Sequence, residues 1–140
     1  MKQLKSLSTL AAVLLAVLFL SACGSPKATL EATKTNPAAL GEVRLEDKDD
    51  NGNNVIQIDV DSLSAPSKID DSLTVYVVWI KPEGGDAYQN FGRLKIDDEQ
   101  RGKISFTTPH KSFDVLVTAE EKVDVKTPSN YIVLQGTLKG

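Results

Sequence analysis

The sequence predicts an all-β fold, an antiparallel immunoglobulin-like β-sandwich of seven or eight strands behind a cleaved leader. Three observations support this prediction. Apolar and polar residues alternate with a period of two in several short segments, which is typical of half-buried strands. Turn-forming residues separate these segments, and no sustained period of 3.6 residues is present. The length of 140 residues is suited to one domain of this kind.

The expected strands follow one another at short intervals. Residues 73–80 are apolar on both faces and rich in β-branched and aromatic residues, so we expect a central strand covered on both sides. Residues 43–46 and 56–60 flank an acidic turn and are expected to pair as a hairpin. The remaining expected strands are 92–96, 102–107, 113–118 and 131–138, with a weaker one at 28–33.

Two aromatic residues of the central strand are expected to face opposite ways, because side chains alternate along a strand. Trp79 shares its face with Leu73, Val75 and Val77, so we expect it in the core. Tyr76 lies on the other face, either as a second buried residue or as part of an exposed aromatic patch.

The first 22 residues have the composition of an export signal. Lys2 and Lys5 form a short positive start, and residues 10–20 are uncharged and apolar. That apolar run is about half of the ~20 residues that a membrane-spanning helix needs. We therefore expect a signal peptide that is removed from the mature protein.

The leader ends in Leu20, Ser21, Ala22 and Cys23. These residues resemble the lipobox of bacterial lipoproteins at all four positions: aliphatic, small, small and cysteine. The resemblance implies a diacylglyceryl group on the Cys23 thiol, cleavage just before Cys23, and an N-acyl chain on the new amino terminus. Two or more acyl chains give stable membrane anchoring. The alternatives are an ordinary secretory signal and a free cysteine.

The lipobox resemblance sets the expected organisation and location. We expect a signal peptide at 1–22, the lipidated cysteine with a short polar tether at 23–27, and the sandwich at 28–140. The protein is then expected in the cell envelope, anchored to a bacterial membrane and facing away from the cytoplasm. Gly24 resembles the pattern of lipoproteins sent to an outer membrane, where the cell has two membranes.

A second resemblance covers residues 76–136. The ordered features that carry it are Tyr76 and Trp79, Gly84 and Gly85, Gly92 and Leu94, Phe113 to Glu120, Pro128 and Ser129, and Val133 to Gly136. Together they resemble the extracytoplasmic β-sandwich of anti-sigma-K-type factors and related small envelope lipoproteins. Those factors carry a cytoplasmic sigma-binding segment and a membrane-spanning helix, where this chain has only the leader. The resemblance therefore implies the fold and not the regulation.

An acidic segment between two expected strands resembles the start of a calcium loop. Asp47, Asp49, Asn51 and Gly52 match the spacing D-x-D-x-N-G, in which oxygens at alternating positions surround a hard cation. The twelfth position, where such loops have a glutamate, is Ile58. The alternative is a solvated hairpin turn, since Asn-Gly is favoured where two residues need positive φ.

Other candidate sites are weaker. Tyr88 and Phe91 flank a Gly-rich loop that is a candidate recognition loop, the alternative being an ordinary connection with buried aromatic ends. His110 is the one histidine, and we expect it in an exposed loop. No spaced catalytic motif accompanies it. The single cysteine excludes an intrachain disulfide, and the interspersed charges offer no electrostatic surface for nucleic acid.

These observations favour a non-enzymatic envelope lipoprotein that acts by binding or structural support at the membrane surface. Its expected partners are the membrane, through the lipid on Cys23, and an unidentified envelope protein or ligand. No cofactor is expected beyond that lipid. The alternative is a calcium-binding adhesion or sensing module that uses Asp47, Asp49 and Asn51.

Overall fold

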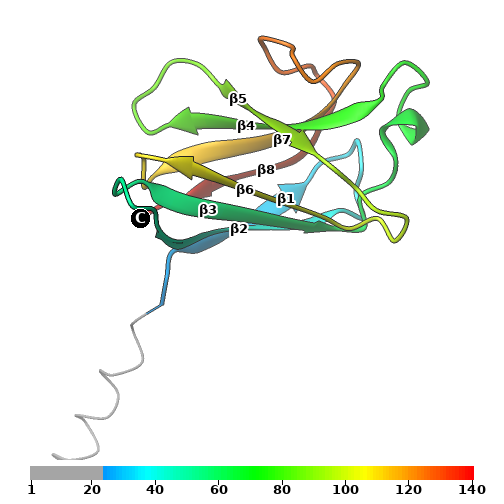
Figure 1. Ribbon diagram of the computed structural model, residues 1–140. Helices are drawn as coiled ribbons and strands as arrows, with labels where there is room; N and C mark the ends of the chain where they lie inside the picture. Colours follow the sequence, from blue (N-terminus) through cyan, green and yellow to red (C-terminus); the bar gives the residue numbers. More distant parts are fainter. Residues whose placement is uncertain (1–23) are drawn as a thin grey trace, which may run out of the picture.

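The computed structural model describes residues 24–140, so Cys23 and the expected leader lie outside the described residues. Within 24–140 the chain forms eight strands and one 3-10 turn (Figure 1). The elements are β1 (Lys27–Ala32), β2 (Leu40–Lys48), β3 (Asn54–Asp61), η2 (Pro66–Lys68), β4 (Val75–Pro82), β5 (Gln89–Leu94), β6 (Gly102–Thr108), β7 (Phe113–Glu120) and β8 (Ile132–Leu138). All paired strands are antiparallel, which confirms the predicted all-β class.

The strands form two layers that share β1. Their order is β5-β4-β7-β8-β1-β2-β3-β6. The first part of β1 pairs with β2, and its last residues, Glu31 and Ala32, pair with β8. The predicted hairpin is confirmed, because β2 and β3 pair along most of their length. One strand thus joins the two layers of the sandwich along one side.

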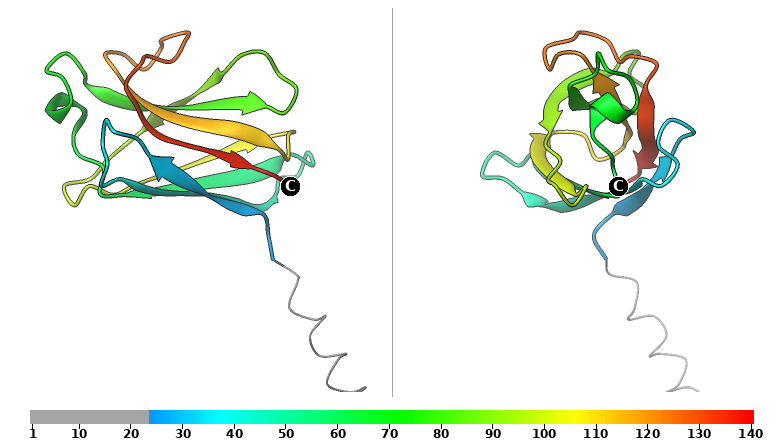
Figure 2. Two further views of the ribbon diagram at one scale, coloured as in Figure 1. Left: turned by 180° about the vertical axis from the view of Figure 1, so that it is seen from behind. Right: turned by 90° about the vertical axis from the view of Figure 1, so that its right-hand side faces the viewer.

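The outer strands β5 and β6 approach each other on the opposite side. The rings of Phe91 and Phe106 lie with centroids 4.8 Å apart, and Ile96 forms an isolated bridge with Gly102. Viewed nearly along the strands, the sheet forms an almost complete ring (Figure 2, right). The sandwich is therefore nearly closed, which shields edges that would otherwise be open to strand pairing.

Two glycines allow β1 to pass between the layers. The side chain of Leu30 is buried beside Gly41. A Cβ added at Gly41 would lie 2.9 Å from the Leu30 Cβ. A Cβ on Gly136 would lie 2.8 Å from the Thr29 carbonyl oxygen. Such distances are too short for real atoms, so β2 and β8 need glycine where they flank β1.

Several expected boundaries were wrong by a few residues; the strand expected at 43–46, for example, extends over Leu40–Lys48. The central strand begins at Val75 and not at Leu73, because Leu73 and Thr74 complete the connection from β3. The strand expected at 92–96 is β5, which lies earlier and bulges near Gly92, where φ is +106°. Lys27, expected in the tether, already pairs with β2.

The buried residues of β4 divide between two clusters. Tyr76, Val78 and Ile80 face the main core between the layers. Val75, Val77 and Trp79 form a smaller cluster with Leu116 on the outer face of the sheet. The prediction of a strand covered on both sides is confirmed.

The assignment of the two aromatic residues needs correction. Trp79 is buried as expected, but it belongs to the smaller cluster, against which Val125 and Ile132 also pack. Tyr76 is 1% exposed in the main core, so the exposed aromatic patch was wrong. Leu73 joins Tyr76 in the main core and not Trp79, because it precedes the strand and does not follow its alternation.

The strand connections gather at two ends of the domain (Figure 1). One end, which we call the anchor-side end after the lipid anchor expected at Cys23, holds the start of β1, the connections 49–53, 83–88 and 109–112, and the last residues of the chain. The far end holds the connections 33–39, 62–74, 95–101 and 121–131.

Candidate functional site

The acidic segment predicted as a calcium loop forms the tight turn between β2 and β3. One carboxylate oxygen of Asp49 accepts hydrogen bonds from the backbone N–H groups of Asn51 and Asn53, both at 2.9 Å. Gly52 has a φ of +79° and donates its N–H to the Asp49 carbonyl at 3.0 Å. The backbone bonds from Asn53 and Asn51 hold the pKa of the Asp49 carboxyl below its usual value. Asp49 thus caps the turn.

The other two residues of the predicted calcium loop lie on either side of this cap. A carboxylate oxygen of Asp47 accepts the Lys48 N–H at 2.8 Å, next to an irregularity in the pairing of β2 and β3. Asn51 is exposed at the tip of the turn. Over residues 24–140, no three or more His, Cys, Asp or Glu side chains are grouped so that they could hold a metal ion.

The two aromatic residues of the predicted recognition loop lie in different surroundings. Tyr88 packs against the Trp79 cluster, with the Lys81 Nζ 5.1 Å from its ring centroid. Burial raises the pKa of the Tyr88 hydroxyl. Phe91 packs against the main core and the ring of Phe106. The structure therefore does not bring Tyr88 and Phe91 together into one surface.

His110 is exposed in the connection between β6 and β7, as predicted. Its backbone N–H donates to the Thr108 hydroxyl at 3.3 Å, and its carbonyl accepts a bond from the Asn54 amide at 3.1 Å. These contacts fix the backbone of the connection.

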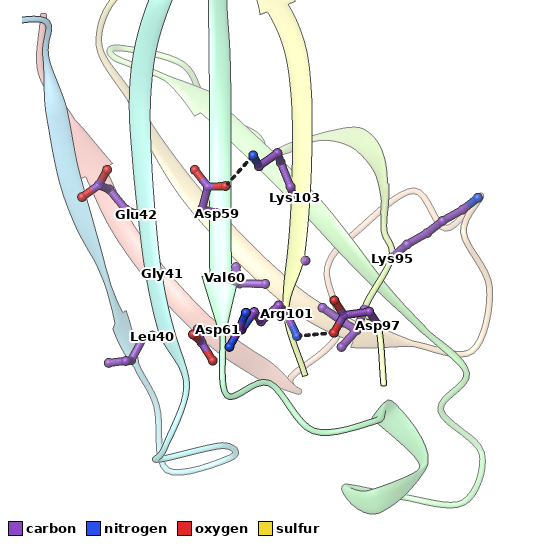
Figure 3. A pocket seen from close by; sticks show the side chains of 12 residues that line it. Leu40, Gly41, Glu42, Asp59, Val60, Asp61, Lys95, Asp97, Arg101 and Lys103 are labelled. Atoms are coloured by element: carbon purple, nitrogen blue, oxygen red, sulfur yellow. Dashed lines mark hydrogen bonds and ion pairs between the residues drawn. The ribbon is translucent and has the colours of Figure 1, made fainter. Parts of the chain in front are cut away.

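A shallow depression lies on the outward face of β2, β3 and β6 near the far end (Figure 3). Its charges are paired across the strands. The Lys103 Nζ lies 3.7 Å from Asp59, and the Arg101 Nε lies 3.6 Å from Asp61. Arg44 approaches Asp59 at 3.3 Å from the other side. Exposed pairs of this kind contribute little to stability, but they leave few charges free for a ligand.

A second hollow, which we call the far-end cleft, lies beside this depression and has a volume of about 660 Å³. Its lining includes Tyr76 and Leu94, both buried residues of paired strands. The Tyr76 hydroxyl donates to the Ser64 carbonyl at 2.6 Å. Burial raises the pKa of Tyr76 to about 12, so the phenol stays protonated and neutral.

Three exposed cations also line the far-end cleft: Lys68, Arg93 and Lys95. None of them takes part in the ion pairs found within residues 24–140. Two carboxylates, Asp97 and Asp98, share the lining. One Asp97 oxygen accepts the backbone N–H groups of residues 99 and 101, both at 2.9 Å. The cleft thus combines an apolar surface with a mixed but more cationic border.

The connections that border the cleft hold strained backbone. Ser62 and Gln100 have φ values of 57° and 65°, and they are the only non-glycine residues with positive φ within 24–140. The N–H of Leu63 donates to the Gln100 carbonyl at 3.1 Å, which ties the two connections together. Non-glycine residues in this region persist only where the surroundings hold them, and they are frequent at functional sites.

A buried polar chain fastens the 121–131 connection over the Trp79 cluster. The Trp79 Nε1–H donates to the Thr118 hydroxyl at 2.8 Å, and that hydroxyl donates to the Glu120 carboxylate. The Ser129 N–H donates to the same carboxylate at 2.9 Å. Glu120 is buried although its side chain is polar, so these bonds offset part of the cost of removing it from water.

Asn90 of β5 holds the same connection through its side chain. Its amide donates to the carbonyls of Val123 and Val125 at 2.7 and 3.0 Å. Its side-chain oxygen accepts the Gly92 N–H at 2.8 Å. Sequence reasoning missed both this contact and the polar chain; the available signal was the pair of polar residues Thr118 and Glu120, which follow the apolar run from Val115 to Val117 in β7.

Comparisons with models of known protein families and with curated proteins find no match for this chain. Within residues 24–140, no helix has the length and apolar character needed to span a membrane. Function is therefore inferred from the sequence of the expected leader and from the geometry of the domain.

Proposed function

We propose that this protein is a lipid-anchored module of the bacterial cell envelope that binds a partner without catalysing a reaction. The main support is the sequence Leu20, Ser21, Ala22 and Cys23, which matches the lipobox pattern at the end of a short apolar leader. Lipidation of Cys23 would hold the β-sandwich at the membrane surface.

The fold supports this proposal because the domain begins so soon after the proposed anchor. Lys27, only four residues after Cys23, is already paired in β1 at the anchor-side end. An extended chain spans at most about 3.5 Å per residue, so four steps reach about 14 Å. The anchor-side end would then lie next to the membrane, and the far end would face away from it.

A binding role agrees with the way the far end is built. Its long connections surround the far-end cleft and are held by non-local hydrogen bonds, such as that between the Tyr76 hydroxyl and the Ser64 carbonyl. Connections held on a rigid scaffold are a common location for binding residues. The far end is therefore our candidate for the binding surface.

The test is to replace the proposed lipid attachment site in the full chain. In cells, Cys23→Ser should move the protein from the membrane fraction to the soluble fraction or leave it as an uncleaved precursor without lipid. Ser25→Ala, two residues further along, is the matched control and should fractionate like the wild type. Membrane association and acyl labelling of Cys23→Ser equal to those of the wild type would contradict the proposal.

A further inference from the structure

The far-end cleft and the neighbouring depression differ in how their charges are neutralised. In the depression, Arg101 and Lys103 pair with carboxylates of adjacent strands. In the cleft, Lys68, Arg93 and Lys95 form no ion pair with residues 24–140. Most charges of the depression are thus engaged in internal pairs, whereas the cleft keeps cations available for a ligand.

Lys95 separates the two hollows and lines both. Figure 3 shows its side chain directed away from the paired residues of the sheet face. Its neighbours along the chain provide different chemistry, because Leu94 is buried and Ile96 is half-buried. An apolar surface with cations beside it suits a ligand that carries both apolar groups and negative charges.

We propose that the far-end cleft binds an acidic, extended segment of a partner protein, with an apolar side chain over the half-buried Ile96 and carboxylates beside the cations. This inference rests on the proposed function, since it names the kind of partner that a membrane-anchored binding module would take. The partner's carboxylates meet Lys68, Arg93 and Lys95, and each such contact is a solvent-exposed ion pair of modest strength.

A peptide fits this cleft better than a dense polyanion does. Asp97 and Asp98 lie in the same lining, so closely spaced phosphates would meet carboxylates as well as cations. Carboxylates on alternate residues of an extended chain are spaced more widely, because side chains on one side recur about every 6.6 Å. Such spacing allows the acidic groups to approach the cations separately.

The strained connections help to fix the shape of the cleft before a ligand binds. The hydrogen bond between Leu63 and Gln100 ties together the two connections that hold the positive-φ residues. Because a preformed site loses less conformational freedom on binding, a short peptide is a sufficient probe.

The test is an NMR titration of the isotopically labelled full chain in detergent micelles. The probe is an acetylated and amidated pentapeptide, DLELD, and its matched control is NLQLN, which has the same shape without charge. We expect DLELD to shift the amide signals of residues 64–68 and 93–100 and NLQLN to leave them unchanged. Added salt should weaken the DLELD shifts, since salt screens exposed charges.

Substitutions in the cleft test whether the DLELD shifts arise from binding there. The double substitution Arg93→Gln and Lys95→Gln should weaken DLELD binding about fivefold, as expected for the loss of two exposed ion pairs. Both side chains are exposed, so signals outside the cleft should be unaltered. Lys34→Gln, at the same far end but outside the cleft lining, is the matched control and should bind like the wild type.

Three results would overturn the proposal: no shift at the cleft with DLELD, equal shifts with NLQLN, or stronger binding of tripolyphosphate than of DLELD at the same residues. The last result would indicate a phosphate-bearing ligand instead. The titration measures peptide binding at the cleft directly and does not depend on lipidation of Cys23. Its failure would therefore leave the lipidation test of Cys23 unaffected, and failure of lipidation would leave the titration valid.

Discussion

The two ends of the domain are built in different ways. The anchor-side connections contain four to six residues, and those of the far end contain seven to thirteen. The turn capped by Asp49 is closed by bonds between residues at most four apart. At the far end, by contrast, the Tyr76 hydroxyl reaches the Ser64 carbonyl, and Asn90 reaches Val123.

This difference supports the proposal that one small sandwich combines attachment at one end with recognition at the other. The short turn at 49–53, with its local cap, helps to keep the end near the proposed membrane anchor compact. Long connections fixed by distant contacts create the far-end cleft, because they pass over the ends of several strands. The comparison predicts that the far end is sensitive to substitutions far away in the sequence, and that the turn at 49–53 is not.

The largest expected effect is that of Trp79→Ala. Trp79 is fully buried and begins the polar chain that fastens the 121–131 connection. Removal of a buried tryptophan leaves a cavity and costs about 3 to 5 kcal/mol of unfolding free energy. Urea denaturation measures this loss, and faster amide exchange in residues 121–131 should accompany it.

Leu40→Ala is the control for this prediction. Leu40 is also a large apolar residue, but it is 64% exposed, so the expected loss is below about 0.5 kcal/mol. If Trp79→Ala cost less than about 1 kcal/mol, the Trp79 cluster would not be the support of the far end that we describe.

A smaller effect is expected from Asn90→Ala. This substitution removes the two hydrogen bonds to the carbonyls of Val123 and Val125. Since the bonds are exposed, the expected loss of unfolding free energy is about 1 kcal/mol. Amide exchange should accelerate in residues 121–131 and stay unchanged in the turn at 49–53. Gln89→Ala, at the exposed neighbouring position, is the control, and equal effects of the two substitutions would contradict the role of Asn90.

At the anchor-side end, Asp49→Asn tests the turn cap through its pH dependence. The folded state lowers the pKa of Asp49 from 3.8, so its charged form stabilises the fold above that pH. The stabilisation is lost as the pH falls through the lowered value. Asparagine accepts the same backbone bonds without a charge. The variant should therefore be slightly less stable at neutral pH, with a gap that closes in strong acid.

Urea denaturation at several pH values measures that gap. Asp50→Asn removes a charge from the neighbouring position of the same turn and controls for charge alone. A gap between Asp49→Asn and the wild type that stays constant down to strong acid would show that the Asp49 charge does not stabilise the turn.

The smallest expected effect is that of calcium on thermal stability. The Asp49 oxygen that faces the turn already accepts two backbone N–H groups, and Ile58 stands where a closing glutamate is needed. We expect the same melting temperature with millimolar calcium and with a chelator. A ligand that binds the folded state raises the melting temperature, so a rise abolished by Asp49→Asn would favour the calcium-binding alternative.

The sequence predicted the strands well because their signal is local. Alternation along β3 and the two-sided apolar character of β4 are visible without knowledge of any neighbour. The turn at Asn51 and Gly52 was predictable for the same reason, because its conformation depends on those two residues.

The far-end cleft was not predictable because its parts lie far apart in the chain. Lys68 comes from the β3–β4 connection and Arg93 from β5, and both line the cleft only when β4 and β5 pair. The face of Trp79 was misassigned for a related reason. A strand that is apolar on both sides does not show which side meets the main core, and the covering connection lies about forty residues later.

The most direct test of the central claim is mass spectrometry of the protein purified from its native membrane. Our account predicts that the first residue is Cys23, that residues 1–22 are gone, and that the amino-terminal peptide carries the added mass of a diacylglyceryl group, with or without a third acyl chain. A mature protein that retains the leader, or one with an unmodified Cys23, would contradict the account.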